Sequence, residues 1–383
     1  MKKSKIKQIC VLSPGYPTDE QPWFPFVEQL LCALTEYGVQ CVVISPQSIS
    51  KSLTHPEFLR PIYWEKRYKN NIIKIYQPKI VTFSTLKIGK TVVTDLIVER
   101  SIIKCFEQLN QKFDAIYGHF WTYGLIASKI GKKYNIPAFV ACGESIIPYT
   151  KLERNLYYKD YLNGVICVST KSQNECMELG LCSKDKTIVC PNGIDTELFY
   201  KHNKEEARRL LGIDDDKFIV CYVGAFSERK GSKRLSTALN KLENVYSIFI
   251  GTGEQAPTCK NCIFAGPLPH EQVPVYLSAS DVFVLPTLHE GCCNAIVEAL
   301  ACGLPVISSD LSFNDDILDT SNSLKIDPNN VEEIGNAIIT IQEDIQLREK
   351  LQTGALNKAK NLSIKARAAN ILKFMEMQIE KTE

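Results

Sequence analysis

The sequence predicts an α/β protein made of two Rossmann-like domains in succession, each with a parallel sheet covered by helices. Short apolar runs alternate with amphipathic stretches along both halves of the chain, a pattern typical of parallel sheets whose strands are buried on both faces. The pattern starts again after a turn-rich stretch at residues 191–203. A chain of 383 residues is long enough to form two or three domains with large cores.

Each expected element follows from its local pattern: strands are short runs rich in Val and Ile, and helices show apolar residues three and four positions apart. In the first half we expect strands at 8–13, 40–45, 72–75, 115–118, 138–142, 165–168 and 187–190, with helices at 25–37, 94–109, 124–134 and 171–179. In the second half we expect strands at 218–223, 246–250, 263–265, 282–285 and 305–308, with helices at 204–211, 232–241, 269–278, 294–301 and 328–343.

The turn-rich stretch gives the expected domain boundary. We expect an N-terminal, acceptor-side domain at 1–195 and a C-terminal, donor-binding domain at 196–363, with a last helix at about 364–383 packing back on the first domain. Ligands of open α/β sheets bind beyond the carboxyl ends of the strands. Two facing sheets therefore predict a binding cleft between the domains.

The composition is that of an ordinary globular protein. A hydrophobic content of 45% with 23% charged residues argues against disorder. The apolar run after the basic N-terminus is too short for a signal peptide, and no window approaches the roughly 18 apolar residues of a membrane-spanning helix. We therefore expect a cytoplasmic protein. Most of the 15 cysteines lie in apolar runs and are expected to be buried free thiols.

Charge is unevenly distributed along the chain. Residues 1–200 carry 25 Lys+Arg and 18 Asp+Glu, whereas residues 201–383 carry 20 and 25. A basic first half suits a phosphorylated acceptor or an anionic membrane surface, and a chance distribution of solvated side chains would give the same difference. Residues 60–79 interleave six basic residues with aromatic ones, which suits lipid head groups or sugar phosphates. For their structure, a loop ending in an ordinary strand is favoured.

Residues 281–310 contain the clearest candidate ligand site. They predict a buried strand, a turn of small residues, a short amphipathic helix and a second buried strand. The N–H groups around Gly291–Asn294 have no partners within the first helical turn, and the helix dipole adds positive charge there. A diphosphate fits such a site, with Glu290 and Glu298 near it to hold sugar hydroxyls. The alternative is an ordinary crossover with two solvated glutamates.

Five segments together carry a family resemblance. In chain order they are SPGYP at 13–17, GHF at 118–120, PNGID at 191–195, VGAFSERKG at 223–231, and EGCCNAIVE at 290–298 followed by ALACGLPV. They resemble the N-terminal glycine loop, the histidine motif, the linker, the phosphate-binding loop and the paired glutamates of the retaining GT-B glycosyltransferases of glycosyltransferase family 4 (group 1). The match spans nearly the whole chain, and its order is far more specific than any one motif.

The resemblance implies a donor site in the second half of the chain. Lys230 would bind the donor diphosphate, Glu298 the ribose hydroxyls and Glu290 the hydroxyls of the transferred sugar. Lys230 precedes an expected helix start, so its ammonium can reach a phosphate held there; a solvated lysine is the alternative. The other implied donor-site residues are Gly15, Arg229, Gly291, Cys292, Cys293 and Asn294. Two departures from the family pattern are Ala225, where an arginine is usual and Arg229 is the nearest replacement, and the Cys292-Cys293 pair.

Acceptor-side roles are implied for three residues of the first half. His119 ends an expected strand and, by resemblance, contacts the donor sugar or the acceptor hydroxyl; a core or capping histidine is the alternative. Tyr16 follows Gly15 and would offer an aromatic face beside the acceptor. Glu144 lies where the family often has a polar His-Gly-Ser-Asp segment. His119, Lys230 and Glu290 are the expected catalytic residues.

The implied reaction needs no enzymic nucleophile, because the leaving group is a nucleotide diphosphate. The family's usual mechanism is a front-side displacement in which the departing phosphate helps to remove the acceptor proton. No Asp-x-Asp follows a strand, so we expect no metal, and no cofactor. A dehydrogenase is disfavoured, because no G-x-G-x-x-G follows the first strand.

The expected function is sugar transfer with retention from a UDP- or GDP-linked donor to a glycan or lipid-linked acceptor in cell-surface polysaccharide synthesis. A GT-B nucleotide-sugar epimerase and a catalytically weak scaffold that binds nucleotide sugars remain as alternatives. No nucleic-acid partner is expected. Peripheral contact with the inner face of the membrane through residues 60–79 is a hypothesis.

Overall fold

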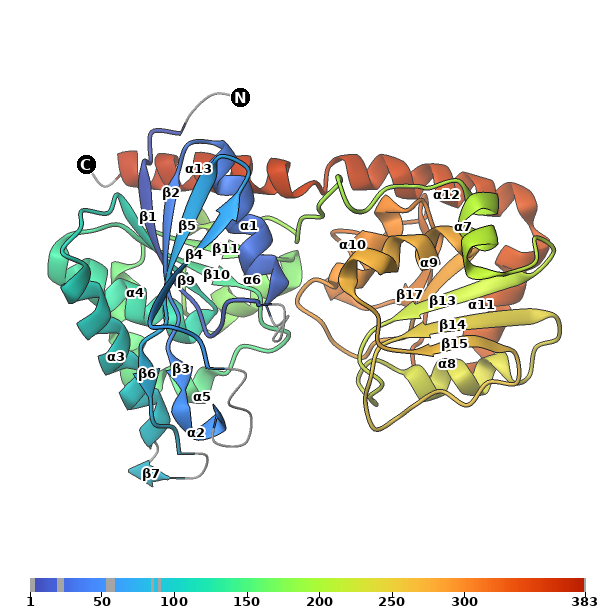
Figure 1. Cartoon of the computed structure of the whole chain (residues 1–383), viewed down its shortest axis with the longest axis horizontal. Helices are drawn as coiled ribbons and strands as arrows, with labels where there is room; N and C mark the ends of the chain where they lie inside the picture. The colour runs from blue at the N-terminus through green and yellow to red at the C-terminus, as the bar shows by residue number, and fades with distance from the viewer. Residues whose placement is uncertain (1–3, 19–23, 53–58, 84–85, 89–90, 382–383) are drawn as a thin grey trace. The chain divides into compact units, whose positions relative to one another are not determined.

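The computed structural model describes residues 4–18, 24–52, 59–83, 86–88 and 91–381, and the chain divides into two compact units (Figure 1). Unit 1 comprises Met1–Cys190 and Lys365–Glu383, and unit 2 comprises Pro191–Ile364. Residues 382–383, at the end of the expected C-terminal helix, lie outside the described part of the chain.

The sheet of unit 1 has eight strands within the described residues, in the order β12-β11-β10-β9-β1-β2-β5-β4. Neighbouring strands are parallel except β4 and β5, which are antiparallel. The bounds are β1 Gln8–Leu12, β2 Gln40–Ile44, β4 Tyr63–Tyr68, β5 Asn71–Tyr76, β9 Ala115–His119, β10 Ala138–Cys142, β11 Gly164–Cys167 and β12 Thr187–Val189. Two small pairs, β3 Gln47–Ser48 with β6 Lys79–Ile80 and β7 Lys87–Ile88 with β8 Thr91–Val92, lie apart from it.

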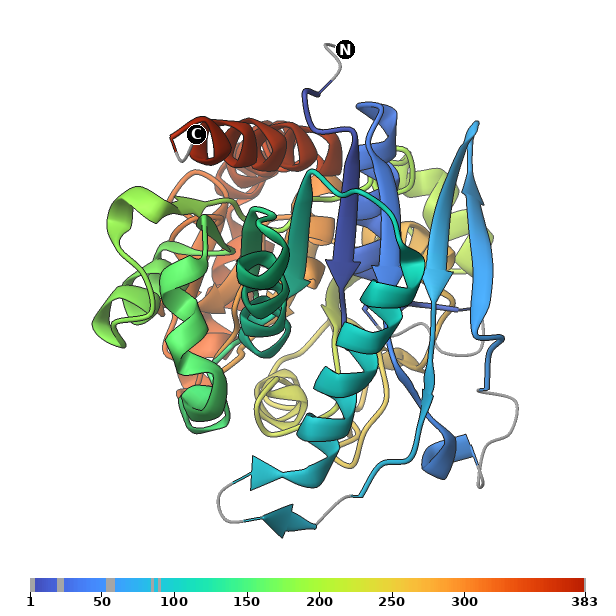
Figure 2. The ribbon, with the colours of Figure 1, turned by 90° about the vertical axis from the view of Figure 1, so that its left-hand side faces the viewer.

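The helices of unit 1 are α1 Pro25–Glu36, α2 Ile49–Ser52, α3 Val93–Leu109, α4 Trp121–Tyr134, α5 Tyr149–Leu152, α6 Thr170–Glu178 and α13 Ile364–Glu380, with 3₁₀ turns η2 Glu153–Tyr161 and η3 Lys184–Lys186. Helices α3 and α4 pack on one face through a core that includes Ile44, Ile102, Ile116 and Ile126 (Figure 2). Helix α13 packs beside β10 and β11, where the Phe374 ring lies 6.5 Å from that of Phe139.

Unit 2 contains a second sheet, which is parallel throughout. Its order within the described residues is β15-β14-β13-β16-β17-β18. The strands are β13 Phe218–Val223, β14 Val245–Ile250, β15 Cys262–Gly266, β16 Val282–Leu285, β17 Val306–Ser309 and β18 Ser323–Ile326. The helices are α7 Lys204–Leu211, α8 Ser232–Leu239, α9 Val273–Ala279, α10 Asn294–Ala301, α11 Val331–Glu343 and α12 Ile345–Lys360, with 3₁₀ turns η4 His270–Gln272 and η5 Ser312–Asn314.

Residues 60–79 differ from the expected loop ending in one strand. They form a hairpin in which β4 pairs with β5 around a tight turn at Lys69, whose φ is 52°. Strand β4 alternates exposed and half-buried residues at the sheet edge, so it lacks the continuous apolar run by which the expected strands were recognised. The hairpin also makes the sheet of unit 1 mixed instead of wholly parallel.

Among the described residues, no helix has both the length and the apolar character needed to cross a membrane.

Candidate functional site

Strands β13 and β16 are neighbours in the sheet of unit 2 and run parallel, so the loops that follow them leave the same sheet edge. The first loop leads into α8 and carries Arg229 and Lys230; the second leads into α10 and carries Glu290. Sheet order therefore brings together two segments about 60 residues apart in the chain, at the carboxyl edge where ligands of such sheets bind.

Three donors converge on one oxygen of Glu290. Its Oε1 lies 2.7 Å from Lys230 Nζ, 2.6 Å from Arg229 Nη1 and 2.8 Å from the Thr287 hydroxyl. Glu290 is buried, and Lys230 is largely so. Two cations beside one carboxylate leave net positive charge in a partly desolvated place, which favours an anionic ligand.

The charge of Lys230 is secured by its surroundings. Burial acts to lower the pKa of Lys230, but the Cys293 sulfur and the Glu290 carboxylate outweigh it, so that its pKa is raised above the ordinary value. Cys293 Sγ lies 3.6 Å from Lys230 Nζ. The Cys293 sulfur thus contributes to the wall of the site, which gives Cys293 a packing role.

Gly231 places Lys230 at the start of α8. Its φ is +76°, and a Cβ at this position would lie 2.5 Å from the carbonyl oxygen of Pro286. Only glycine adopts such a conformation at low cost and also leaves room for the neighbouring backbone. The close contact holds the loop after β13 against the loop after β16.

The turn before α10 is held by Asn192. Its amide donates to the Cys292 carbonyl at 3.0 Å and to Asn294 Oδ1 at 2.7 Å. Gly291, Cys292 and Cys293 are buried there. Asn192 had no assigned role in the sequence-based prediction, although the PNGID match that contains it was the available signal.

Glu298, expected to bind ribose, is paired with a histidine. Its Oε1 lies 2.9 Å from Nε2 of His270, which belongs to η4. Burial acts to lower the pKa of His270, but the hydrogen bond and charge of Glu298 outweigh it and raise its pKa. His270 was missed, because nothing in its local sequence indicates which carboxylate it meets.

In unit 1, His119 ends β9 as a buried side chain. Its ring stacks on Phe26 at 5.0 Å and meets Phe120 edge-on at 4.7 Å. Burial, together with the charge of Arg367, lowers the pKa of His119 to about 3. The imidazole is therefore neutral near pH 7. Within the described structure, its buried Nδ1 has no hydrogen-bond partner.

Glu144 follows β10 in the chain, and its side chain lies against the N-terminus of α4. Its Oε1 accepts a hydrogen bond of 2.6 Å from the Trp121 N–H, so the carboxylate occupies a helix N-terminus, where negative charge is favoured. Burial nevertheless raises the pKa of Glu144 to about 7. The group therefore changes charge near neutral pH.

Gly15 and Tyr16 lie at the carboxyl end of β1. A Cβ on Gly15 would lie 2.7 Å from the ring of Phe24, so close packing explains this glycine. Tyr16 is 4% exposed and meets Trp64 edge-on at 5.6 Å. The ring thus faces Trp64 instead of offering the free aromatic face that we expected.

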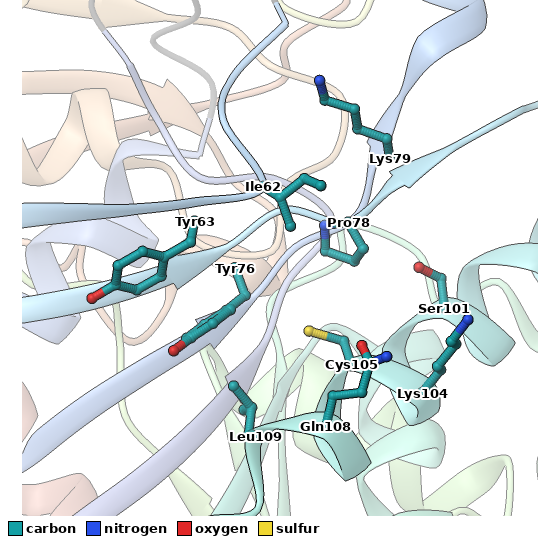
Figure 3. Close-up of a pocket in the computed structure, with 10 residues that line it drawn as sticks. All are labelled: Ile62, Tyr63, Tyr76, Pro78, Lys79, Ser101, Lys104, Cys105, Gln108 and Leu109. Carbon is teal, nitrogen blue, oxygen red and sulfur yellow. The ribbon is translucent and has the colours of Figure 1, made fainter.

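A cavity of about 550 Å³ lies between the β4–β5 hairpin and α3. Tyr63 and Tyr76 line it with ring centroids 4.9 Å apart, and Lys79 and Lys104 are at its rim (Figure 3). This cavity brings aromatic and cationic side chains from the 60–79 segment together on unit 1. Among the described residues, no group of three or more His, Cys, Asp or Glu side chains is placed to hold a metal ion.

Family models match both units. The model described as "Glycosyltransferase Family 4" matches residues 26–198, and the one described as "Glycosyl transferases group 1" matches residues 203–358. The two matches together span most of the chain. The chain belongs to glycosyltransferase family 4 (group 1).

Curated relatives of this family 4 chain include two bacterial proteins. One is a putative teichuronic acid biosynthesis glycosyltransferase, TuaC, of Bacillus subtilis, which is 29% identical over 64% of this chain and 66% of its own. The other is a UDP-Gal:alpha-D-GlcNAc-diphosphoundecaprenol alpha-1,3-galactosyltransferase of Escherichia coli. It is 24% identical over 64% of this chain and 70% of its own. The matches thus span about two thirds of the length of these relatives.

Solved structures confirm the predicted GT-B fold class. Sucrose-phosphate synthase from Thermosynechococcus elongatus superposes with a TM-score of 0.79 at 20% identity, covering 98% of this chain and 100% of that one. HepE of Anabaena in complex with UDP superposes with a TM-score of 0.71 at 18% identity, and the match covers 97% of this chain and 100% of HepE. At such identities the likeness establishes the fold alone: two parallel-sheet α/β units, with the β4 hairpin strand as an antiparallel edge.

Proposed function

We propose that this family 4 member transfers a sugar, with retention, from a UDP- or GDP-linked donor to a glycan or lipid-linked acceptor in cell-surface polysaccharide synthesis. The observation that carries the proposal is the convergence of Lys230 and Arg229 on Glu290 beside the first turn of α10. Such a group suits a ligand that joins a diphosphate to a sugar.

Donor binding in this proposal exchanges the hydrogen-bond partners of Lys230 and Arg229. A bound diphosphate competes with Glu290 for Lys230 and Arg229, and the freed carboxylate oxygen then accepts from a hydroxyl of the sugar. Glu298 has one oxygen engaged by His270, which orients the carboxylate so that its second oxygen can accept from the ribose.

Catalysis in this proposal rests on electrostatics. As the bond to the sugar breaks, charge accumulates on the departing diphosphate, and Lys230 with the N–H groups at Gly291–Asn294 stabilises it. No protein nucleophile is needed, because the diphosphate is a good leaving group and its oxygen can take the acceptor proton. His119, neutral and buried, serves as a hydrogen-bonding group on the acceptor side instead of as a charged acid.

Relatives support the chemical class of the substrates. The Escherichia coli relative is named for a UDP-Gal donor and a diphosphoundecaprenol-linked acceptor, and HepE was solved with UDP. We extend this class, a nucleotide sugar and a glycan or lipid-linked acceptor, to the present chain. The β4–β5 hairpin, with Ile62, Tyr63 and Ile72 exposed, is the surface we propose for peripheral contact with an anionic membrane.

Thermal shift with a nucleotide panel tests the donor site. We expect UDP or GDP to raise the melting temperature, and the matching nucleoside to have little effect, because the cations bind the phosphates. If no nucleoside diphosphate stabilises the protein, the donor-site assignment is wrong. Product NMR then reports the anomeric configuration, and inversion would contradict retention. Interconversion of a UDP-sugar without any acceptor would indicate the epimerase instead.

Sedimentation with liposomes tests the membrane contact. We expect binding to anionic vesicles at low salt and loss of binding at high salt, because exposed basic side chains are screened. Equal sedimentation with and without vesicles at low salt would rule this contact out.

A further inference from the structure

Four cysteines of unit 1 form one cluster. Cys142 of β10 and Cys167 of β11 are register partners on adjacent strands, and Cys176 of α6 lies over them with its Sγ 3.5 Å from that of Cys142. These three are buried in the core around Trp121, and Cys182 packs against the same core from its edge. The donor-site contacts of Lys230, Arg229 and Glu290 use none of these thiols.

The end of α6 brings Cys182 to Cys176. Gly180, with φ +63°, reverses the chain, and the Leu181 N–H donates to the Cys176 carbonyl at 2.9 Å. Cys182 is only partly buried, and it lines a surface pocket of about 310 Å³ together with Lys159 and Lys186. One member of the cluster is thus open to small reagents.

The surroundings distinguish Cys182 from the buried thiols. The neighbouring Cys176 thiol and the charges of Lys159 and Lys186 lower the pKa of Cys182, against burial and Asp185. By contrast, the hydrogen bond with Cys167 and burial raise the pKa of Cys142, and the hydrogen bonds with Cys142 and Cys182 and burial raise that of Cys176. The thiolate is the reactive form of cysteine, so reactivity is concentrated at the one accessible member.

We propose that Cys182 and Cys176 are a redox-sensitive pair, in which a hydroperoxide oxidises Cys182 and Cys176 closes a disulfide with it. The Cys182 thiolate attacks one peroxide oxygen and breaks the O–O bond, giving a sulfenic acid and hydroxide. The Cys176 thiol then attacks the Cys182 sulfur, and the sulfenic oxygen leaves as water. In sum, two thiols and one hydrogen peroxide give one disulfide and two waters. In a reducing compartment such a disulfide is transient.

The cluster links this chemistry to the acceptor side of the proposed transferase. Cys142, in contact with Cys176, precedes Glu144 by two residues, and its neighbour Ala141 is paired with His119 across β10 and β9. Drawing Cys176 toward Cys182 removes a packing partner from the end of β10. We therefore expect oxidation to lower transfer activity reversibly, a consequence that rests on the proposed function, whereas formation of the disulfide does not.

Mass spectrometry of the full chain tests the pair. Residues 172–184 form a tryptic peptide that contains Cys176 and Cys182 and no other cysteine. After treatment with an equimolar amount of hydrogen peroxide and alkylation, we expect this peptide to be two hydrogens lighter and unalkylated, and to return to the alkylated dithiol after reduction. Cys182→Ser should prevent oxidation of Cys176. Cys176→Ser should leave a sulfenic acid at Cys182 that dimedone traps.

Cys259 of unit 2 is the matched control. It is also partly buried, but burial raises its pKa. We expect Cys182 to be alkylated faster than Cys259 at pH 7, because a lowered pKa gives a larger fraction of the reactive thiolate. Equal rates, or a disulfide from Cys182 to another cysteine in Cys176→Ser, would overturn the proposal. These readouts do not depend on transferase activity, so they separate failure of the redox pair from failure of the proposed function.

Discussion

Lys230 Nζ lies 2.7 Å from Glu290 Oε1, although the two residues are 60 positions apart and follow different strands of unit 2. The contact exists because β13 and β16 are neighbours in the sheet and their loops leave it at the same edge. A lysine at a helix start and a glutamate before another helix thereby become one charged group suited to a sugar diphosphate.

Removing either member should slow sugar transfer. We expect Lys230→Ala and Glu290→Ala each to lower kcat by about 10²–10³, the usual cost of losing one contact that stabilises transition-state charge. The measurement is steady-state kinetics with the donor identified by thermal shift. Lys233→Ala is the matched control, because Lys233 is an exposed residue of α8, and it should retain wild-type turnover. Near-wild-type turnover in either site variant would refute the assignment.

Gly231→Ala should destabilise the protein. A residue with a side chain is destabilised by about 1–2 kcal/mol at the Gly231 φ of +76°. The close contact of its Cβ with the Pro286 carbonyl oxygen adds to this destabilisation. Urea unfolding measures the effect. Gly335→Ala is the control of opposite sign: Gly335 lies within α11, and a Cβ there would meet only Leu242, at 3.8 Å. The free energy of unfolding of this control should be unchanged or should increase by up to about 1 kcal/mol. Equal effects of the two substitutions would contradict the prediction.

Glu144→Gln should change how stability depends on pH. The pKa of Glu144 is raised to about 7 from its ordinary 4.5, so its contribution to folding is fully present below pH 4.5 and is lost as pH rises through about 7. The free energy of unfolding of the wild type, minus that of the variant, should therefore decrease from pH 4.5 to about pH 7 and stay constant at higher pH. Urea unfolding at several pH values measures it, and a difference independent of pH would show that Glu144 titrates normally.

His270→Gln should remove a pH dependence of stability that originates in unit 2. Glu298 raises the pKa of His270 above its ordinary 6.5, so the contribution of the charged pair is present below pH 6.5 and disappears as pH rises through the raised value. The wild type should lose stability over that range relative to the variant. Glu298→Gln should abolish the same dependence, because it removes the partner. If Glu298→Gln leaves the dependence unchanged, the pair is not its origin.

Much of the fold was predictable because its signals are local. Apolar runs such as 218–223 and 282–285 predicted β13 and β16, and the pattern at 294–301 predicted α10. Strand β4 was missed because an exposed edge strand has no apolar run. Helix α12 was missed because its buried side chains are few and Gly354 lies within it; that glycine lets the carbonyl oxygen of Ser321 approach closely.

The sequence by itself determined the α/β class, the family, and the candidate donor residues Lys230, Glu290 and Glu298, because these depend on local spacing and motif order. Only the tertiary structure decided which side chains meet: Arg229 and Lys230 on one oxygen of Glu290, His270 on Glu298, Tyr16 against Trp64. The physical reason is that such pairs depend on strand order and on packing between segments distant in the chain. Local periodicity carries no information about either.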